Sequence, residues 1–227
     1  MDTGTRGELV DRVLTAIQAV TVTHPLRVAI DGPPAAGKTT LADELGDALR
    51  AHGRFVVRAS IESFLLPRAQ RYRRGELSAE ACYHDSFDLD ALHRALLDPL
   101  GPGGDRLFRR EVYDRITDSA VSEPMTSAPV DAVLIFEGVF LMRPELVDDW
   151  DLSIFVSASP EETLRRARVR DEALYGTPDD VEQRFRSRYL PSQRFYLDTV
   201  RPTDLVDIVV RNDEPERPGW VVRSDQV

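Results

Sequence analysis

The amino-acid sequence predicts an α/β protein in which about five parallel strands form a central sheet with helices on both faces. Two observations favour this fold class. Short apolar runs that fit buried strands alternate along the chain with longer stretches whose apolar residues recur at helical spacing. The chain has 227 residues, which fits one such domain, and 42% of them are hydrophobic, which is enough to bury a core.

Each expected element follows from its own pattern. Apolar residues at helical spacing predict an amphipathic helix over residues 6–20. The run "LRVAI" (26–30) fits a buried parallel strand, and residues 38–53 fit a helix that a glycine closes. The further expected strands are 54–60, 131–140, 152–159 and 205–212, and the further expected helices are 88–100, 159–174 and 178–198.

Two long segments show no clean period and are expected to carry the ligand-binding loops. They are residues 61–87 and 105–130, and the second is expected to hold a short hairpin around residues 106–114. Both are expected to lie above the carboxyl edge of the sheet, where doubly wound sheets bind their ligands. Residues 1–212 are therefore expected to form a single domain, and the Pro- and Gly-containing residues 213–227 a loose tail.

Composition narrows the classes of partner and the compartment. The formal net charge is −10, which opposes binding to nucleic-acid phosphates. No apolar run approaches the ~18 residues that span a bilayer, and the N-terminus lacks the pattern of a secretory signal. Cys82 is the only cysteine, so an intrachain disulfide and a Cys-rich zinc site are excluded. We therefore expect a cytoplasmic protein without nucleic-acid or membrane partners.

A phosphate-binding loop is predicted between the strand at 26–30 and the following helix. The sequence matches G-x-x-x-x-G-K-[ST] at every fixed position, with a strand before it and a helix after it. Glycines let the backbone N–H groups turn toward a phosphate, and the helix N-terminus adds its positive dipole end. The expected nucleotide-binding residues are Gly32, Pro33, Pro34, Ala35, Ala36, Gly37, Lys38, Thr39 and Thr40.

Two side chains of this loop have expected roles in chemistry. Lys38 is the only lysine among the 29 basic residues, so a composition that otherwise uses arginine has kept lysine at the motif position. It is expected to bridge the β- and γ-phosphates, and the Thr39 hydroxyl to ligate Mg²⁺. Glu137, at the end of the apolar strand "VLIFE", is expected to hold the same metal or its water. The alternative for Glu137 is an ordinary strand-end acid facing solvent.

The nucleotide and the reaction class follow by elimination. Guanine is read by an Asn-Lys-x-Asp element, which cannot exist here because Lys38 is the only lysine, so ATP is expected. A compact one-domain chain favours a small-molecule kinase. Arg166 and Arg170 are four residues apart and share one helical face. They stand at the start of an expected lid near residues 166–180. They are expected to neutralise charge on the transferred phosphoryl group, the alternative being a solvated helix face.

Together, these motifs resemble the uridine kinase and phosphoribulokinase family of P-loop kinases over roughly residues 26–211. The resemblance rests on "GPPAAGKTT", "ASIESF", "VYD", "VLIFEG" and "RRARVRD" in this order. It implies a five-stranded P-loop kinase fold with a small lid, and transfer of a phosphoryl group from Mg-ATP to a small-molecule hydroxyl. It also makes a dimer or tetramer plausible.

The resemblance further implies residues of the acceptor site. Glu62 stands where the family has an aspartate that activates the substrate hydroxyl, and it is expected to act as the general base. The other implied acceptor residues are Tyr83, Asp85, Tyr113 and Asp114. Uridine kinases usually place a His and an Arg shortly after the Tyr-Asp pair, whereas this chain has Asp118 and Ala120. Solvated loop acids and plain packing residues are the alternatives for these positions.

The acceptor class remains open among several candidates. The first expectation is a nucleoside, as in uridine kinases, and the alternatives are a phosphorylated sugar or a pantothenate-like alcohol. The arginine-rich run at residues 68–74 is read as a solvated flap or as a binding site for a phosphate-bearing substrate. The competing class is a regulatory protein that binds ATP and phosphorylates nothing.

Overall fold

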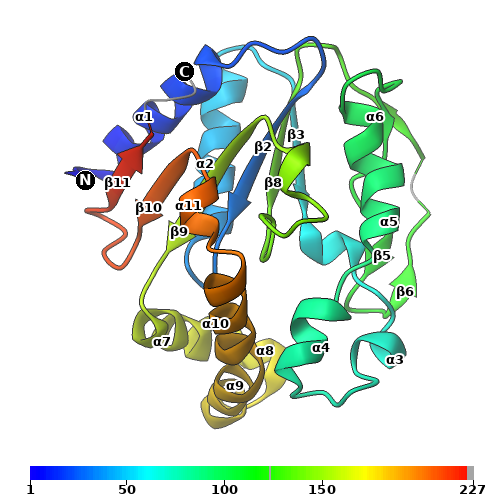
Figure 1. The fold of residues 1–227 in the computed structure, drawn as a ribbon, viewed down its shortest axis with the longest axis vertical. Coiled ribbons are helices and arrows are strands. Elements are labelled where there is room, and N and C mark those ends of the chain that lie inside the picture. The colour runs from blue at the N-terminus through cyan, green and yellow to red at the C-terminus, as the bar shows by residue number, and fades with distance from the viewer. Residues whose placement is uncertain (123, 224–227) are drawn as a thin grey trace.

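The computed structural model describes residues 1–122 and 124–223. At its centre lies a seven-stranded sheet with the strand order β1-β11-β10-β9-β2-β8-β3 (Figure 1). Five adjacent strands are parallel, which confirms the predicted α/β class. They are β2 (Leu26–Asp31), β3 (Val56–Ser60), β8 (Val133–Glu137), β9 (Leu152–Ser157) and β10 (Ile208–Arg211).

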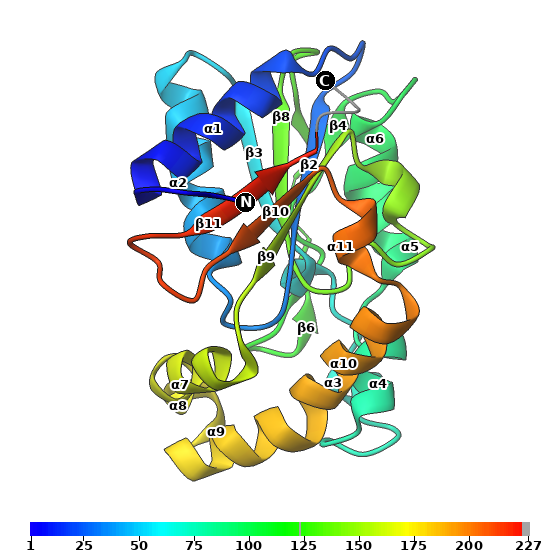
Figure 2. The same cartoon turned by 60° about the vertical axis from the view of Figure 1, so that its left-hand side comes forward.

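Helices cover both faces of the sheet, so its central strands β2, β8 and β9 are almost entirely buried (Figure 2). On one face, α1 and α2 pack against β2 and β9 through residues such as Val13 and Leu45. On the other face, Leu97 and Tyr196 pack against Phe136 of β8. The helices and helical turns of these layers are α1 (Arg6–Ala19), α2 (Lys38–Ala51), α5 (Leu89–Leu92), η2 (His93–Leu97), α6 (Asp98–Leu100), η3 (Val147–Asp149), α10 (Leu190–Thr199) and α11 (Pro202–Leu205).

The C-terminal segment is ordered, so the prediction of a loose tail was wrong for its central part. β11 (Gly219–Val222) pairs antiparallel with β10, and β1 (Asp2–Thr3) pairs antiparallel with β11. Trp220 is only 7% exposed because it packs into the core beneath α1. Burial of this ring and the strand hydrogen bonds hold the segment to the sheet edge. The last part of the predicted tail, residues 224–227, lies outside the described residues.

The lid expected near residues 166–180 falls within a group of three helices, residues 160–184, that we call the lid segment: α7 (Pro160–Arg170), α8 (Glu172–Tyr175) and α9 (Pro178–Arg184). The single helix expected over 159–174 is interrupted at Asp171, whose backbone leaves the helical region and whose carboxylate binds the neighbouring Arg170. A π-helical turn, η4 (Phe185–Tyr189), joins the lid segment to α10.

The first irregular segment lies beyond the carboxyl edge of the sheet, whereas the second starts beside α6 at the opposite end, so the expectation that both lie at the carboxyl edge was wrong for part of the second (Figure 2). The first contains η1 (Ile61–Phe64), α3 (Arg68–Arg71) and α4 (Ala79–His84). The second forms two short ribbons, β4 (Leu107–Phe108) with β7 (Thr126–Ser127) and β5 (Tyr113–Asp114) with β6 (Ser119–Ala120). The hairpin expected within 106–114 was therefore wrong, because its two halves pair with separate later strands. Buried Phe108 and Tyr113 hold these halves against the core.

No helix of the described residues is both long and apolar enough to cross a bilayer.

Candidate active site

The phosphate loop joins β2 to α2, and its two glycines occupy positions that other residues cannot adopt without strain. Gly32 has φ +145°, and a Cβ there would lie 2.1 Å from the carbonyl oxygen of Val156. Gly37 has φ +100°, and its Cβ would lie 2.3 Å from Nδ2 of Asn212. Both glycines are required because neighbouring strands approach the loop too closely for a side chain.

Side chains from distant elements also fix the shape of the loop. Asn212, directly after β10, donates from Nδ2 to the carbonyl oxygen of Ala36 at 2.7 Å. Ala35 packs into a small apolar cluster with Ala167, Val181 and Phe185. The lid segment therefore rests directly on the phosphate loop.

Lys38 opens α2 and turns back over the loop. Its Nζ donates to the carbonyl oxygen of Pro33 at 2.8 Å, and the residue is 7% exposed. Burial lowers the pKa of this ammonium, whereas the carboxylates of Glu137, Asp31 and Glu62 act in the opposite direction. The ammonium thus lies within electrostatic reach of acids on both sides of the loop, the arrangement that a residue bridging two phosphates needs.

Thr39 and Glu137 lie together, as expected of a pair that holds a metal ion. The Thr39 hydroxyl donates to Oε1 of Glu137 at 3.3 Å. Glu137 ends β8 and pairs in register with Ile30 of β2 and Ser60 of β3. A hydroxyl and a carboxylate are the hard oxygen donors that Mg²⁺ takes, with nucleotide oxygens and water completing its shell. No cluster of three or more potential metal-ligating His, Cys, Asp or Glu side chains occurs in the described part of the chain.

A cavity of about 350 Å³ extends from this pair toward the edge of the sheet. Its walls include Thr39, Glu137, Ser60, Ser63 and Arg110. It connects the expected metal position with the turn that carries Glu62.

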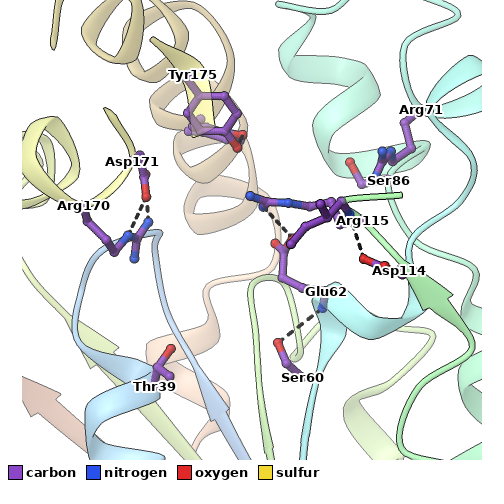
Figure 3. A network of polar contacts seen from close by, with 12 residues as sticks. Thr39, Ser60, Glu62, Arg71, Ser86, Asp114, Arg115, Arg170, Asp171 and Tyr175 are labelled. Carbon is purple, nitrogen blue, oxygen red and sulfur yellow. Dashed lines mark hydrogen bonds and ion pairs between the residues drawn. The ribbon is translucent and has the colours of Figure 1, made fainter. Parts of the chain in front are cut away.

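Glu62 lies on the turn η1, immediately after β3. Its backbone N–H donates to the Ser60 hydroxyl at 3.3 Å, and its side chain is 51% exposed. Arg115, from the turn between β5 and β6, donates from Nη1 to Oε2 of Glu62 at 3.1 Å (Figure 3). Burial lowers the pKa of Arg115, but the charge and hydrogen bond of Glu62, together with Tyr175 and Tyr189, more than offset it, so the pKa is raised above its ordinary value. Arg115 was not among the sequence-predicted residues.

The two lid arginines differ in their surroundings. Arg166 is held at the loop side, where Nη2 donates to the carbonyl oxygen of Asn212 at 2.6 Å and Nε donates to Glu162 at 2.7 Å. Arg170 is 56% exposed and binds Asp171 through two hydrogen bonds of 2.6 and 2.9 Å. Its charge also lowers the pKa of Lys38. This arrangement favours Arg170 over Arg166 as the arginine available to a phosphoryl group.

The side chains of the expected acceptor residues Tyr83 and Asp85 both contact other residues of the protein. Tyr83 is 6% exposed, and its ring lies edge-on to Phe140 at 5.0 Å and to Phe195 at 5.1 Å. This burial favours the packing alternative for Tyr83. Oδ2 of Asp85 lies 2.8 Å from Nε of Arg74, which holds the acid to the arginine-rich segment.

The neighbouring residues Tyr113 and Asp114 of the β5–β6 hairpin make different contacts. The Tyr113 hydroxyl donates to Oδ1 of Asp118 at 2.6 Å, so Asp118 forms part of the same surface. Asp114 accepts from the backbone N–H of Ile116 and from the Thr117 hydroxyl, both at 2.8 Å, and hydrogen bonding to them lowers its pKa. It stabilises the turn that presents Arg115.

A buried hydrogen-bond chain behind the loop was also missed by sequence reasoning. Asp31, the last residue of β2, accepts from the N–H of Gly32 at 2.7 Å and from the Tyr196 hydroxyl at 2.5 Å. The same hydroxyl accepts from the N–H of Met142 at 2.9 Å. An acid immediately before the first glycine was the only local signal, because its partner lies on α10 near the C-terminus.

Comparisons with known proteins agree with this geometry. The model of the Phosphoribulokinase / Uridine kinase family matches residues 28–212. Uridine-cytidine kinase B of Dictyostelium discoideum is 27% identical over 196 residues, which is 82% of this chain and 78% of that protein.

Solved structures give the same picture of the fold. A possible uridine kinase from Bacillus stearothermophilus superposes with a TM-score of 0.70 at 24% identity, over 89% of this chain and 97% of that one. D-glycerate 3-kinase from Cryptococcus neoformans superposes with a TM-score of 0.60 at 16% identity, over 95% and 97% of the two chains. The fold is thus that of these kinases, and the family match over residues 28–212 shows that the chain belongs to the Phosphoribulokinase / Uridine kinase family.

Proposed function

We propose that this protein is an ATP- and Mg²⁺-dependent kinase that transfers the γ-phosphoryl group to a hydroxyl of a small molecule. The main support is the geometry around the loop motif, where Lys38 folds back onto the loop and the Thr39 hydroxyl contacts Glu137 at 3.3 Å. The cavity of about 350 Å³ beside this pair is also lined by Ser60 and Ser63, which flank Glu62, so the residues assigned to the metal and to the acceptor lie around one space. Mg-ATP, when bound, supplies the electrophilic phosphorus and a leaving group.

In this proposal, the residues of the chain position the two substrates and neutralise the charge of the phosphates. The amides of the loop and Lys38 bind the phosphates, and Thr39 and Glu137 hold the metal ion. Glu62 accepts the proton of the acceptor hydroxyl. Arg115 contacts one oxygen of that carboxylate, Oε2, and we assign the other oxygen to the hydroxyl. Arg170 neutralises charge that develops on the transferred group.

The name of the relative from Dictyostelium suggests a nucleoside acceptor, in agreement with the first expectation from the sequence. The D-glycerate kinase likeness shows that this fold also serves an acceptor of a different class. The reaction is therefore proposed at the level of a hydroxyl acceptor, with nucleosides, phosphorylated sugars and pantothenate-like alcohols as candidates to be tested.

The proposal is tested by acceptor-dependent formation of ADP with these candidates. Lys38→Ala is expected to abolish turnover and Glu62→Gln to lower kcat by at least ~10²-fold, the lower end for loss of a general base. Both variants should melt near the wild-type temperature. Arg194→Gln, at an 85% exposed position of α10, serves as the matched control.

Two results would contradict the assignment. Unchanged turnover in Lys38→Ala would remove the loop from the mechanism. ATP hydrolysis that no acceptor stimulates would instead favour the regulatory class of ATP-binding protein.

A further inference from the structure

Three buried arginines surround one tyrosine ring beside the expected acceptor segments. The guanidinium carbons of Arg71, Arg184 and Arg188 lie 5.6, 5.5 and 5.2 Å from the ring centroid of Tyr72. These arginines are only 4%, 6% and 3% exposed. They come from α3, α9 and η4, and we call them the Tyr72 arginine cluster.

The positive charge of the cluster exceeds the negative charge near it. Arg184 pairs with Glu76 at 2.8 Å, and Arg71 pairs with Asp118 at 3.3 Å. The two acids are 63% and 38% exposed, so solvent screens them more than the buried guanidinium groups. Nε of Arg71 is buried and has no hydrogen-bond partner among the described residues.

Within residues 1–122 and 124–223, no acidic side chain lies within ion-pair distance of Arg188. It donates to the carbonyl oxygens of Glu76 and Ser78 at 3.2 and 2.9 Å, and to the Ser86 hydroxyl at 3.3 Å. All three acceptor atoms are neutral. Burying a guanidinium without a counter-charge is costly, and stacking on Tyr72 offsets only part of that cost. Arg188 is therefore a buried cation that has no anionic partner among the described residues.

The cluster lies on the acceptor side of Glu62. The backbone carbonyl oxygen of Ser86 accepts from the N–H of Leu66 at 3.0 Å, so Ser86 lies beside the segment that follows the Glu62 turn. Leu65 of that segment also forms a β-bridge with Phe87, the residue after Ser86. In Figure 3, Arg71 and Ser86 appear on one side of Glu62 and Thr39 on the other.

We propose that the acceptor carries an anionic group, a phosphate monoester or a carboxylate, which binds to Arg71, Arg188 and the Ser86 hydroxyl. This inference rests on the proposed kinase function and specifies its substrate class. Guanidinium forks match the oxygens of both anions. A neutral nucleoside would leave the cluster without its counter-charge. The anionic group takes no part in bond making: the hydroxyl oxygen of the acceptor bonds to the γ-phosphorus, the bond to the β-phosphate oxygen breaks, and the proton passes to Glu62.

The first test measures binding, which does not depend on turnover. Isothermal titration calorimetry with Mg²⁺ and a non-hydrolysable ATP analogue compares two matched pairs, a pentose with its monophosphate and glycerol with glycerate. Uridine and cytidine are added as neutral nucleosides. The anionic member of a pair is expected to bind at least about 10-fold more tightly than the neutral one. Preference for the phosphate or for the carboxylate pair distinguishes the two sources of charge. Equal or tighter binding of the neutral members would overturn the proposal.

The second test changes the cluster. Arg71→Gln and Arg188→Gln are expected to weaken binding of the anionic ligand by about 10- to 100-fold and leave the affinity for Mg-ATP unchanged. Arg188→Lys should restore part of the affinity, which a purely structural role would not predict. Arg194→Gln on the neighbouring helix α10 is the control for loss of an arginine. Equal loss of ATP and anion affinity would overturn the proposal.

The outcomes separate this inference from the proposed function. Selective anion binding without any ADP formation would retain the anion site and contradict the kinase. Phosphorylation of uridine or cytidine with no preference for an anionic acceptor, and with unchanged KM in Arg188→Gln, would retain the kinase and contradict the anion site.

Discussion

Tyr196 provides the sharpest test of how the phosphate loop is supported. Its hydroxyl donates to the fully buried carboxylate of Asp31 at 2.5 Å and accepts from the N–H of Met142 at 2.9 Å. Because Asp31 also accepts from Gly32 at 2.7 Å, the chain links α10 to the first glycine of the loop. We expect Tyr196→Phe to leave two buried polar groups, the carboxylate of Asp31 and the N–H of Met142, without the hydroxyl as their hydrogen-bond partner.

The size of the effect follows from those two groups. A buried group that loses its hydrogen-bond partner costs about 1–3 kcal/mol, with the upper part of this range for a charged one. Tyr196→Phe creates almost no cavity, so a loss of about 3 kcal/mol in the free energy of unfolding is expected. For a domain of this size, that corresponds to a fall in Tm of about 6–12 °C.

Urea denaturation measures this loss, and Tyr83→Phe is the matched control. Tyr83 belongs to the same aromatic cluster, because both rings lie edge-on to Phe140, at 5.0 and 5.2 Å. No hydrogen bond of the Tyr83 hydroxyl is found among the described residues, so its removal should cost less than about 0.5 kcal/mol. Equal stability of the two variants at pH 8 would refute the reasoning.

The same variant has an expected pH dependence. Burial raises the pKa of Asp31 above its ordinary value of 3.8, and the hydrogen bond from Tyr196 lowers it part of the way back. Because the pKa of Asp31 is raised in the folded state, the stabilisation that this group contributes is fully present below pH 3.8 and is lost as the pH rises through its pKa in the folded protein. Without the Tyr196 hydroxyl the folded pKa rises further. The destabilisation by Tyr196→Phe should therefore be larger at pH 8 than at pH 5.

Three further predictions follow from the site and the sheet. Gly37→Ala should weaken Mg-ATP binding in calorimetry, because the new Cβ would lie 2.3 Å from Asn212 at φ +100°; unchanged affinity would contradict the close approach. Glu137→Gln should raise the Mg²⁺ concentration for half-maximal ATP binding by about 10- to 100-fold, and an unchanged requirement would leave Thr39 without its assigned partner. Deletion of residues 213–227 should lower the free energy of unfolding by at least about 3 kcal/mol and expose a strand edge, seen as self-association in gel filtration. A monomer of wild-type stability would contradict a structural role for this segment.

The nucleotide side of the site was predictable because its determinants are local. Gly32, Gly37, Lys38 and Thr39 stand at fixed spacing between a strand and a helix, and that spacing alone dictates a phosphate loop. Glu137 was predictable for a related reason, since parallel strands bring their carboxyl ends to one edge of the sheet. In each case, backbone geometry over a few residues decided the placement.

Partners distant in the sequence could not be predicted in the same way. Arg115 meets Glu62 across 53 residues, and Tyr196 meets Asp31 across 165. Neither pair has a local signature, because nothing near one member specifies the other. The same applies to β11, whose order depends on the free edge of β10 and on a place for the ring of Trp220 beneath α1.

This difference explains why the acceptor was harder to predict than the nucleotide. A triphosphate is held largely by main-chain amides of one continuous loop, so the motif that shapes the loop also names its ligand. The acceptor site that we propose combines side chains of η1, α3, the β5–β6 hairpin and η4, which meet only in the folded chain. Arginine-rich "RAQRYRR" is compatible with a solvated flap when considered alone. It becomes a charged interior only when Arg184 and Arg188 from the other end of the sequence enclose Tyr72. The anionic class proposed for the acceptor thus rests on tertiary contacts, and variants of those contacts test it directly.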